Sequence, residues 1–404
     1  MRESDIIIAG AGLSGLAAAA FIADAAPRMT ISVIDLQGSP PAPDDAYCGQ
    51  RVSALTPTSV ARFESLGVWD HVSTAHAKPF SSMRVWDAAT ACGEGVSFNA
   101  AQLDKKTLGV IVDNIALRHH LYGHIAENDN VTFVAGAIQS VTADARSIRV
   151  MLDDGAMHDA SLLIGADGRG SSVRKHCGLA IKAWSHDQVA VVTQLMPDIS
   201  HEDCALQRFM PTGPLALLPL SGGRVSLVWS TTPVDANALL AMDDEAFSVA
   251  VTEASDEVLG TLRCLMPRVS FPLSSQYAKD PVSERAVLIG DAAHAIHPLA
   301  GQGINLGFSD AAALAKIIGD LGDGDPGDAP WLRRYRRRRT ADNLGTLYGL
   351  DLLNRLFARE QGLLADTRRR GMRLFDSSLL AKRLAGGHAM GDALGIMASR
   401  EGVS

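Results

Sequence analysis

The sequence predicts a mixed α/β (α+β) protein, in which an antiparallel-sheet domain is inserted into a parallel-sheet domain and a helical C-terminal tail follows. Three observations predict this architecture. Short apolar runs that end in glycine precede helix-forming runs near the N-terminus and near residue 290. Between residues 182 and 269, apolar and polar residues alternate as in half-buried strands. Beyond a Gly-, Asp- and Pro-rich linker at 319–330, helix formers dominate.

The size and composition of the chain limit the possible classes of protein. Its 404 residues are more than one compact core usually takes, so we expect two domains. The hydrophobic (47%) and charged (20%) fractions are those of an ordinary globular protein. The five scattered cysteines, none at metal or redox spacing, indicate reduced thiols in a cytoplasmic protein. We expect neither a signal peptide nor a membrane-spanning segment.

Charge is unevenly distributed along the chain. The net charge is −8, yet residues 331–404 hold 15 basic and 7 acidic residues, whereas the first 330 hold 22 basic and 38 acidic ones. A basic tail on an acidic body favours contact with an anionic surface, such as lipid head groups or an acidic partner. A solvated helix face would explain the same charges, so composition alone leaves both interpretations open.

The N-terminus has the order strand, glycine-rich turn, helix, strand. Residues 5–9 and 30–34 are β-branched apolar runs, and residues 16–26 between them are rich in helix formers. The turn has the spacing G-x-G-x-x-G, which permits a tight bend and lets a pyrophosphate approach the helix N-terminus. Asp35 lies 20 positions past Gly15, the spacing expected for a carboxylate on a ribose hydroxyl. A Rossmann-like dinucleotide-binding unit is therefore predicted.

Two arginines in the following segments are candidates for contact with a cofactor phosphate. Arg51 precedes a predicted helix that ends near residues 66–69, and Arg118 lies in a segment, 108–122, with helical spacing. For each of them a solvated surface arginine is the alternative. Residues 131–134 and 147–152 are predicted strands.

A second strand-and-turn motif and a third one lie farther along the chain. A buried strand at 160–164 ends at Asp167-Gly168, and another at 286–289 ends at Gly290-Asp291. After the latter, a Gly- and Pro-containing loop leads into a helix at 305–318. Backbone N–H groups at such a helix start suit a phosphate or a reduced flavin. The alternative is a tight turn into an ordinary core helix.

Two further features of the chain predict other roles. His294 and His297 stand at i, i+3, but no carboxylate or Cys accompanies them at ligand spacing, so we predict structural or flavin-adjacent roles and no metal. In the second domain, the prolines of residues 213–220 predict an edge strand or a bend near a cavity. Residues 239–262 are predicted to be mostly helical.

Together the three motifs resemble those of single-component FAD-dependent aromatic hydroxylases, the class A flavoprotein monooxygenases. The finer resemblance is to the ubiquinone-biosynthesis hydroxylases, through residues 207–220 and 301–310 and through the tail segments 349–357, 370–375 and 389–391. One departure is Asp35, where the family more often has Glu; the shorter acid can still accept from ribose hydroxyls. The expected cofactor-binding residues are Gly10, Gly12, Leu13, Ser14, Gly15, Asp35, Arg51, Arg118, Asp167, Gly168, Gly290, Asp291, Pro298, Gly301, Gln302, Gly303, Ile304 and Asn305.

The resemblance also implies a domain plan and roles. The FAD-binding domain would comprise 1–75, 100–181 and 270–330, the substrate domain 76–99 and 182–269, and the basic helical region 331–404. Asp35 would bind the adenosine ribose, Arg51 and Arg118 the pyrophosphate and ribityl chain, and Asp291 the ribityl hydroxyls. Asp167-Gly168 would lie where FAD and NAD(P)H meet, and residues 298–305 against the isoalloxazine.

The activity implied is NAD(P)H- and O2-dependent hydroxylation of a polyprenylated phenol through a flavin C4a-hydroperoxide. FAD carries the chemistry, so no catalytic side chain is assigned, and NAD(P)H would be a transient co-substrate because no second G-x-G-x-x-G unit is present. The partners would be a lipophilic phenol and O2, with no nucleic acid. The basic C-terminal region would bind the inner membrane peripherally or contact a biosynthetic complex.

Two alternatives remain from the sequence. The first is a catabolic hydroxylase of a small soluble phenol such as hydroxybenzoate or salicylate. A charged substrate would need a buried Arg or Tyr cluster in the second domain, but residues 182–269 contain four arginines and no tyrosine, so we rank this interpretation lower. The second is a non-catalytic, flavoprotein-like scaffold of a biosynthetic complex, which should lack bound FAD or fail to turn over NAD(P)H.

Overall fold

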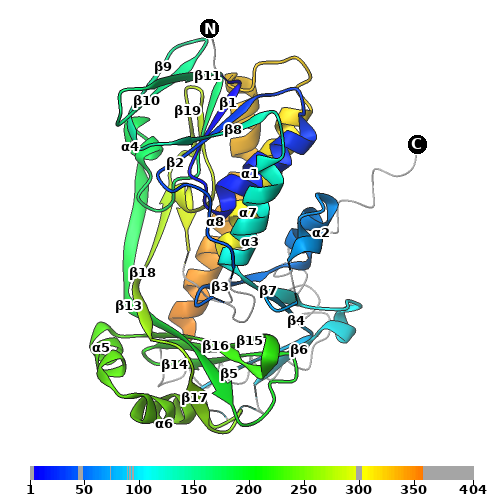
Figure 1. Ribbon diagram of the computed structural model, residues 1–404. Helices are drawn as coiled ribbons and strands as arrows, with labels where there is room; N and C mark the ends of the chain where they lie inside the picture. Colours follow the sequence, from blue (N-terminus) through cyan, green and yellow to red (C-terminus); the bar gives the residue numbers. More distant parts are fainter. Residues whose placement is uncertain are drawn as a thin grey trace, which may run out of the picture.

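The computed structural model describes residues 4–43, 49–72, 74–88, 90, 92, 95–296 and 303–357. A parallel sheet with its helices and a large, mostly antiparallel sheet form two parts of the molecule (Figure 1). The paired strands β13 (Ile181–Pro197) and β18 (Val269–Ala278) run from one part to the other. The predicted mixed α/β class with an inserted antiparallel sheet is thus confirmed.

Apolar β-branched strands build the parallel sheet. All four residues of its central strand, β1, are buried, as expected for a strand covered on both faces. β1 pairs in parallel with β2 and β12, and β12 pairs in parallel with β20. In spatial order the strands are β19 (Val282–Ser283), β20 (Ala286–Leu288), β12 (Leu162–Gly165), β1 (Ile6–Ala9), β2 (Ile31–Asp35) and β8 (Val131–Ala135). The strands predicted in these positions are confirmed.

Helices cover the parallel sheet and bury their small and aromatic residues together. The ring of Phe63 stacks on Phe21 (5.7 Å between centroids) and meets the edge of Phe308 (4.9 Å). These aromatic contacts join three helices into one core. The helices of this part are α1 (Leu13–Ala25), α2 (Pro57–Ser65), α3 (Asn114–Ala126), α4 (Ser172–His176), α7 (Gly303–Gly319) and α8 (Ala329–Phe357). None of the helices within the described residues is long and apolar enough to cross a bilayer.

The predicted helix over residues 108–122 is wrong in its first part. Residues Gly109–Asp113 form the strand β7, which is fully buried between β3 (Val52–Leu55) and β4 (Ala77–Phe80). The helix α3 begins only at Asn114, because the side chain of Asp113 accepts a hydrogen bond from Ile115 N–H (2.7 Å) and caps it. A second small sheet consists of β9 (Ile138–Ala143), β10 (Ile148–Leu152) and β11 (Met157–Ala160).

The large sheet is antiparallel except for the parallel pair β14 and β5. The edge position suggested for residues 213–220 is wrong, because β15 lies between β14 and β16. Its prolines stand near the two ends of the strand, where a missing N–H disturbs the pairing least. In order, the sheet holds β21 (His294–Ala295), β18, β13, β16 (Val225–Thr231), β15 (Gly213–Pro219), β14 (Cys204–Met210), β5 (Ser82–Asp87) and β6 (Val96–Asn99), with β17 (Leu262–Cys264) beside β13.

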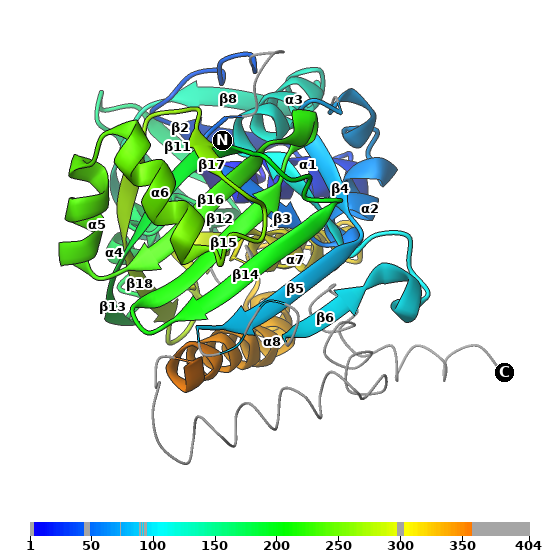
Figure 2. The same ribbon diagram turned by 90° about the horizontal axis from the view of Figure 1, so that it is seen from below.

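The two faces of the large sheet have different neighbours (Figure 2). One face packs Leu227 and Trp229 against α5 (Pro233–Ala241) and α6 (Asp244–Ala254). The opposite face packs Leu218 against residues of β4 and β7. The prediction that residues 239–262 are mostly helical is confirmed, but they belong to two helices, because the side chains of Thr232 and Asp243 cap α5 and α6 separately.

The linker before α8 is held to the parallel sheet by a buried arginine. Arg285 is 4% exposed and donates to the Ser161 carbonyl (3.0 Å) and to both oxygens of Asp325. Arg285→Ala is expected to lower the free energy of unfolding by about 3 kcal/mol, because buried acceptors lose their donor. Urea denaturation measures the change. The control is Arg149→Ala, because the Arg149 side chain is 54% exposed where it pairs with Asp159. A similar loss in that variant would show that burial of Arg285 does not set the size of the effect.

Candidate functional site

Three turns meet at one edge of the parallel sheet. The turns follow β1, β12 and β20, and the carboxyl ends of neighbouring parallel strands lie at the same edge. A Cβ added at Gly10 would be 2.5 Å from the Ala166 carbonyl oxygen, and one added at Gly290 would be 2.6 Å from Ser14 Oγ. The first motif therefore touches both others, and glycine is required at the contact points.

The first turn leaves the start of α1 open. Gly10 has φ +103°, and a Cβ added at Gly15 would lie 1.9 Å from the Gly10 carbonyl oxygen. Gly12 caps the helix without a side-chain hydrogen bond, is exposed, and has open space where its Cβ would be. The first N–H groups of α1 are thus accessible to an anionic ligand.

The predicted residues Asp35 and Arg118 both bind this first turn. Asp35 Oδ2 accepts from the Ala11 N–H (2.6 Å), and Arg118 Nε donates to the Ala11 carbonyl oxygen (2.8 Å). Gln37 contacts both side chains: its backbone N–H donates to Asp35, and its side-chain oxygen accepts from Arg118. A carboxylate has further lone pairs, so Asp35 can still accept from a sugar hydroxyl.

Asp167 supports the second turn and keeps one oxygen without a partner. Its Oδ2 accepts from the N–H groups of Ser172 (2.6 Å) and Val173 (3.1 Å) at the start of α4. Its Oδ1 is buried and has no hydrogen-bond partner among the described residues. Gly168 follows with φ +77°. An unpaired buried oxygen at this turn fits a site completed by a polar ligand.

In the third turn, Asp291 is exposed while its neighbours Gly290, Ala292 and His294 are buried. Although this side chain reaches solvent, the protein packed around the turn partly desolvates the carboxyl group and raises the pKa of Asp291, against the opposing charges of His294 and Arg169. Hydrogen bonds from ligand hydroxyl groups would stabilise the ionised form of such a carboxyl group.

Two side chains that were not predicted join the second and third turns. Arg174 donates to the carbonyl oxygens of Ala292 and Arg169 (2.8 Å each). Gln276, from β18, donates to Arg169 O (3.0 Å) and Asp291 O (3.2 Å). Arg174 follows Asp167-Gly168 closely in the sequence and lies on α4, whereas nothing in the sequence distinguishes Gln276.

A buried carboxylate on α7 fixes the third turn through hydrogen bonds. Asp310, fully buried on α7, accepts from His294 Nε2 (2.5 Å), Arg339 Nε (2.7 Å) and Gly290 N–H (3.2 Å). Burial alone would raise its pKa, but the charges and hydrogen bonds of His294 and Arg339 hold the pKa of Asp310 at about 2. Asn343 on α8 donates a further hydrogen bond to this carboxylate (3.0 Å). Asp310 therefore links the turn to α7 and α8.

The start of α7 is fixed by Asn305. Its Oδ1 accepts from Thr56 N–H (3.0 Å) and Ser59 Oγ (2.8 Å), and its Nδ2 donates to Ala54 O (2.7 Å). These bonds occupy the side chain of Asn305. A ligand at the start of α7 would therefore bind the backbone N–H groups of Gly303, Ile304 and Asn305. The predicted Pro298, Gly301 and Gln302, together with His297, lie outside the described residues.

Arg51 lies between the two parts of the molecule. Its exposed guanidinium stands 5.8 Å from the ring centroid of Phe271 on β18. Within the part of the chain that the structure describes, no group of three or more His, Cys, Asp or Glu side chains could hold a metal ion.

These residues fit a dinucleotide cofactor such as FAD. The open helix start at Gly12, the unpaired Asp167 oxygen and the exposed Asp291 lie on turns that contact one another. They would take a pyrophosphate and hydroxyl-rich groups, and Asp35 would take a ribose.

Comparison with known proteins gives one family and several relatives. Residues 3–343 match the family described as FAD binding domain. The chain is 34% identical over 396 residues to the ubiquinone hydroxylase UbiL of Rhodospirillum rubrum, covering 96% of this chain and 90% of that protein. It is 32% identical over 397 residues to the 3-demethoxyubiquinol 3-hydroxylase of Escherichia coli, covering 96% and 99%.

Solved structures share the fold at lower identity. The p-nitrophenol 4-monooxygenase PnpA of Pseudomonas putida aligns with a TM-score of 0.75 at 18% identity, covering 96% of this chain and 97% of that one. A variant of Klebsiella pneumoniae HpxO, complexed with FAD, aligns with a TM-score of 0.73 at 19% identity, covering 96% and 99%.

Proposed function

This chain belongs to the FAD-binding-domain family, as an FAD-dependent monooxygenase of the ubiquinone-hydroxylase group, and we propose that it hydroxylates the ring of a polyprenylated phenol with NAD(P)H and O2. The observation that carries the proposal is the meeting of three glycine-and-aspartate turns in a chain whose relatives are ubiquinone hydroxylases. The chemistry that FAD supplies when bound is acceptance of a hydride and activation of O2.

The residues of the chain would bind and orient the cofactor. The α1 start would take the pyrophosphate, Asp35 the adenosine ribose, and Asp291 the ribityl hydroxyls. The N–H groups at the start of α7, with the partial positive charge of the helix, would stabilise negative charge on the reduced ring. The parallel-sheet part would thus bind FAD, and the large sheet would bind the substrate.

The face of the large sheet toward β4 and β7 supports a lipophilic substrate. Leu218 and Ala205 pack there with Phe80 and Ile111 in an apolar cluster. Such a wall would exclude water from the reacting centre, which a monooxygenase requires because water diverts the activated oxygen.

The arginines of the substrate domain are engaged elsewhere, which argues against a small carboxylated phenol. Arg208 lies near Asp256, Arg263 pairs with Asp198, and Arg268 pairs with Asp244, while Arg224 is hydrogen-bonded to Ser221 O and Gln194. A carboxylate-binding site would have to break these interactions.

The proposed activity can be tested with isotopic oxygen. The FAD-loaded protein, a phenol with a short prenyl chain, NAD(P)H and ¹⁸O2 are expected to give a product with one ¹⁸O in the ring. 4-Hydroxybenzoate is the comparison substrate and is expected to leave NAD(P)H consumption unchanged. Stimulated consumption with hydroxylation of that acid alone would indicate the catabolic alternative. Lack of bound FAD or of NAD(P)H turnover with either substrate would indicate the scaffold.

A separate prediction concerns membrane binding through α8. In its arginine-rich stretch, Arg336 pairs with Asp280 and Arg339 with Asp310, while Arg333, Arg337 and Arg338 are exposed. We expect salt-sensitive flotation with vesicles that contain phosphatidylserine, because each basic residue near an anionic surface contributes about 1 kcal/mol.

The matched variants replace these exposed arginines. The triple change Arg333→Glu, Arg337→Glu and Arg338→Glu is expected to abolish flotation, and Arg146→Glu, on another exposed turn, to leave it unchanged. If the wild-type protein stays with the soluble fraction at low salt, α8 does not dock on lipid.

A further inference from the structure

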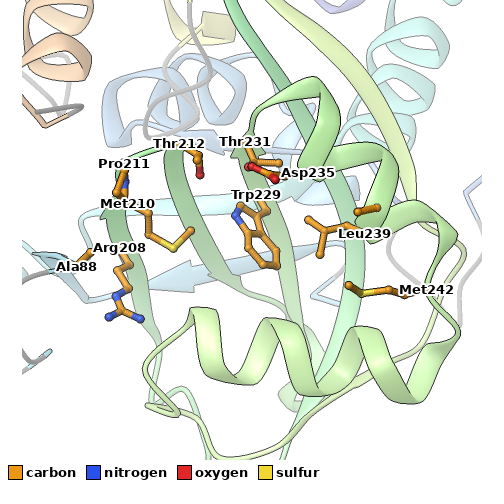
Figure 3. Close-up of a pocket in the computed structure, with 11 residues that line it drawn as sticks. Ala88, Arg208, Met210, Pro211, Thr212, Trp229, Thr231, Asp235, Leu239 and Met242 are labelled. Carbon is orange, nitrogen blue, oxygen red and sulfur yellow. The ribbon is translucent and has the colours of Figure 1, made fainter. Parts of the chain in front are cut away.

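A cavity of about 350 Å³ lies in the large-sheet part, between the sheet and α5 (Figure 3). Its walls are mainly apolar and include Met210 of β14, Trp229 of β16, Leu239 of α5 and Met242 after α5. Arg208 lines one side. A volume of this size holds a single substituted ring.

The sheet separates this cavity from the cofactor site. Side chains alternate between the two faces of a strand, so Trp229 and Leu227 of β16 face α5 and α6 with the cavity. On the neighbouring strand Leu218 faces the opposite way, toward β4 and β7. A ligand in the cavity would therefore not touch the cofactor or the ring being hydroxylated.

The cavity contains a hydrogen-bond donor without an acceptor. Trp229 is 9% exposed, and its Nε1 has no partner among the described residues; the same holds for Nε of Arg208. Figure 3 shows the side chain of Met210 pointing toward the nitrogen-bearing edge of the Trp229 indole. Methionine is flexible, so it can move aside and let a ligand reach this N–H. An unsatisfied buried donor favours a ligand that accepts.

The charges of the two charged side chains that line the cavity, Asp235 and Arg208, are already balanced or hydrogen-bonded, although Nε of Arg208 has no partner among the described residues. Asp235 Oδ2 accepts from the hydroxyls of Thr231 (3.2 Å) and Thr232 (2.8 Å). Arg208 Nη1 donates to Ala254 O (3.0 Å), and its Nη2 lies 3.7 Å from Asp256 Oδ1. The ligand that fits is therefore uncharged, has a flat apolar body and carries oxygen acceptors.

We propose that this cavity is a second, non-catalytic site that binds a quinone ring. A quinone carbonyl accepts but cannot donate, which matches the free N–H of Trp229, and the ring would pack among Met210, Leu239 and Met242. The inference rests on the proposed function, since a protein that hydroxylates a quinone precursor meets quinones. Binding at this site would let the protein sense the quinone without blocking the hydroxylation site.

The test uses duroquinone, whose fully substituted ring cannot add to thiols, and the oxidised FAD-loaded full chain without reductant. Equilibrium dialysis measures affinity and stoichiometry. Trp229→Phe keeps the apolar ring but removes the N–H and is expected to weaken binding at this site about fivefold, the usual effect of one neutral hydrogen bond. Ala238→Phe places a ring into the cavity from an exposed position of α5 and is expected to bind one fewer quinone per chain.

The control is Asn237→Phe, an exposed neighbour on α5 that does not line the cavity, and wild-type binding is expected. If Ala238→Phe binds as many quinones as the wild type with the same affinity, the inference is wrong. Phenol hydroxylation is measured on the same samples. If the wild type hydroxylates the phenol but Ala238→Phe binds quinone as the wild type does, only the second site is overturned. If the wild type does not hydroxylate the phenol, the proposed function is overturned instead.

Discussion

A Gly15→Ala protein is expected to lose FAD and to be strongly destabilised. The added methyl group would lie 1.9 Å from the backbone oxygen of Gly10, which belongs to the neighbouring strand end and cannot rotate away. Relief requires α1 to move off the turn that holds it, so the free energy of unfolding should fall by more than about 3 kcal/mol. The flavin absorbance of the purified protein and its urea denaturation midpoint measure the two effects.

Gly12→Ala is the matched control for that variant. No atom lies within 4 Å of the added Cβ, and the backbone is extended rather than left-handed, so the fold should survive. The methyl group would instead cover the exposed helix start where the pyrophosphate is expected. We expect a stable protein with roughly 100-fold weaker FAD binding, equivalent to about 2.7 kcal/mol. Full FAD affinity in this variant would show that the pyrophosphate does not bind at α1.

Part of the candidate site could be predicted from the sequence. The spacing of strand, turn and acid placed Asp35 correctly beside the first turn, because a Rossmann-like unit has a nearly fixed length. The order of the strands in the sheet then brings the second and third turns to the same edge. The position of Asp35 follows from a local pattern, and Ala11 N–H donates a hydrogen bond to it, whereas the strand order depends on the pairing of distant segments.

Contacts between distant segments could not be predicted in this way. Asp310 and Arg339 lie 29 positions apart on different helices, and a charged residue within an Ala- and Leu-rich helix looks like a surface position. The complete burial of Asp310 depends on four hydrogen-bond donors, His294, Arg339, Gly290 N–H and Asn343, that only the fold brings together. Likewise, the first residues of β13 are polar and do not predict a strand. They form one because they pair with β18.

The buried carboxylate Asp310 provides the second large prediction. Asp310→Asn keeps the shape of the side chain but removes the charge that balances Arg339, which is 7% exposed. It also brings amide N–H groups against the donors of His294 or Arg339. Breaking a buried ion pair from one side costs about 3 to 5 kcal/mol, so we expect a loss of that size at pH 7. Because Gly290 N–H also donates to Asp310, the variant should lose FAD occupancy as well.

The effect of this substitution should depend on pH in a defined direction. The pKa of Asp310 is about 2 in the folded protein, below its ordinary value of 3.8. A carboxylate with a depressed folded pKa stabilises the protein fully above its unfolded pKa, and the contribution is lost as the pH falls toward the folded pKa. The shift corresponds to about 2 kcal/mol, so the stability difference between wild type and variant should narrow below about pH 4.

Asp342→Asn is the control, because it removes a second carboxylate from Arg339 and leaves the buried carboxylate of Asp310 in place. Asp342 also accepts from Arg339 (3.0 Å), but its side chain is 50% exposed, so solvent can replace it and little stability should be lost. Urea denaturation of the three proteins between pH 7 and pH 3 gives the comparison. A constant difference between wild type and Asp310→Asn over this range would mean that Asp310 does not titrate with the fold. Equal losses in the two variants would mean that burial is not what makes Asp310 essential to the third turn.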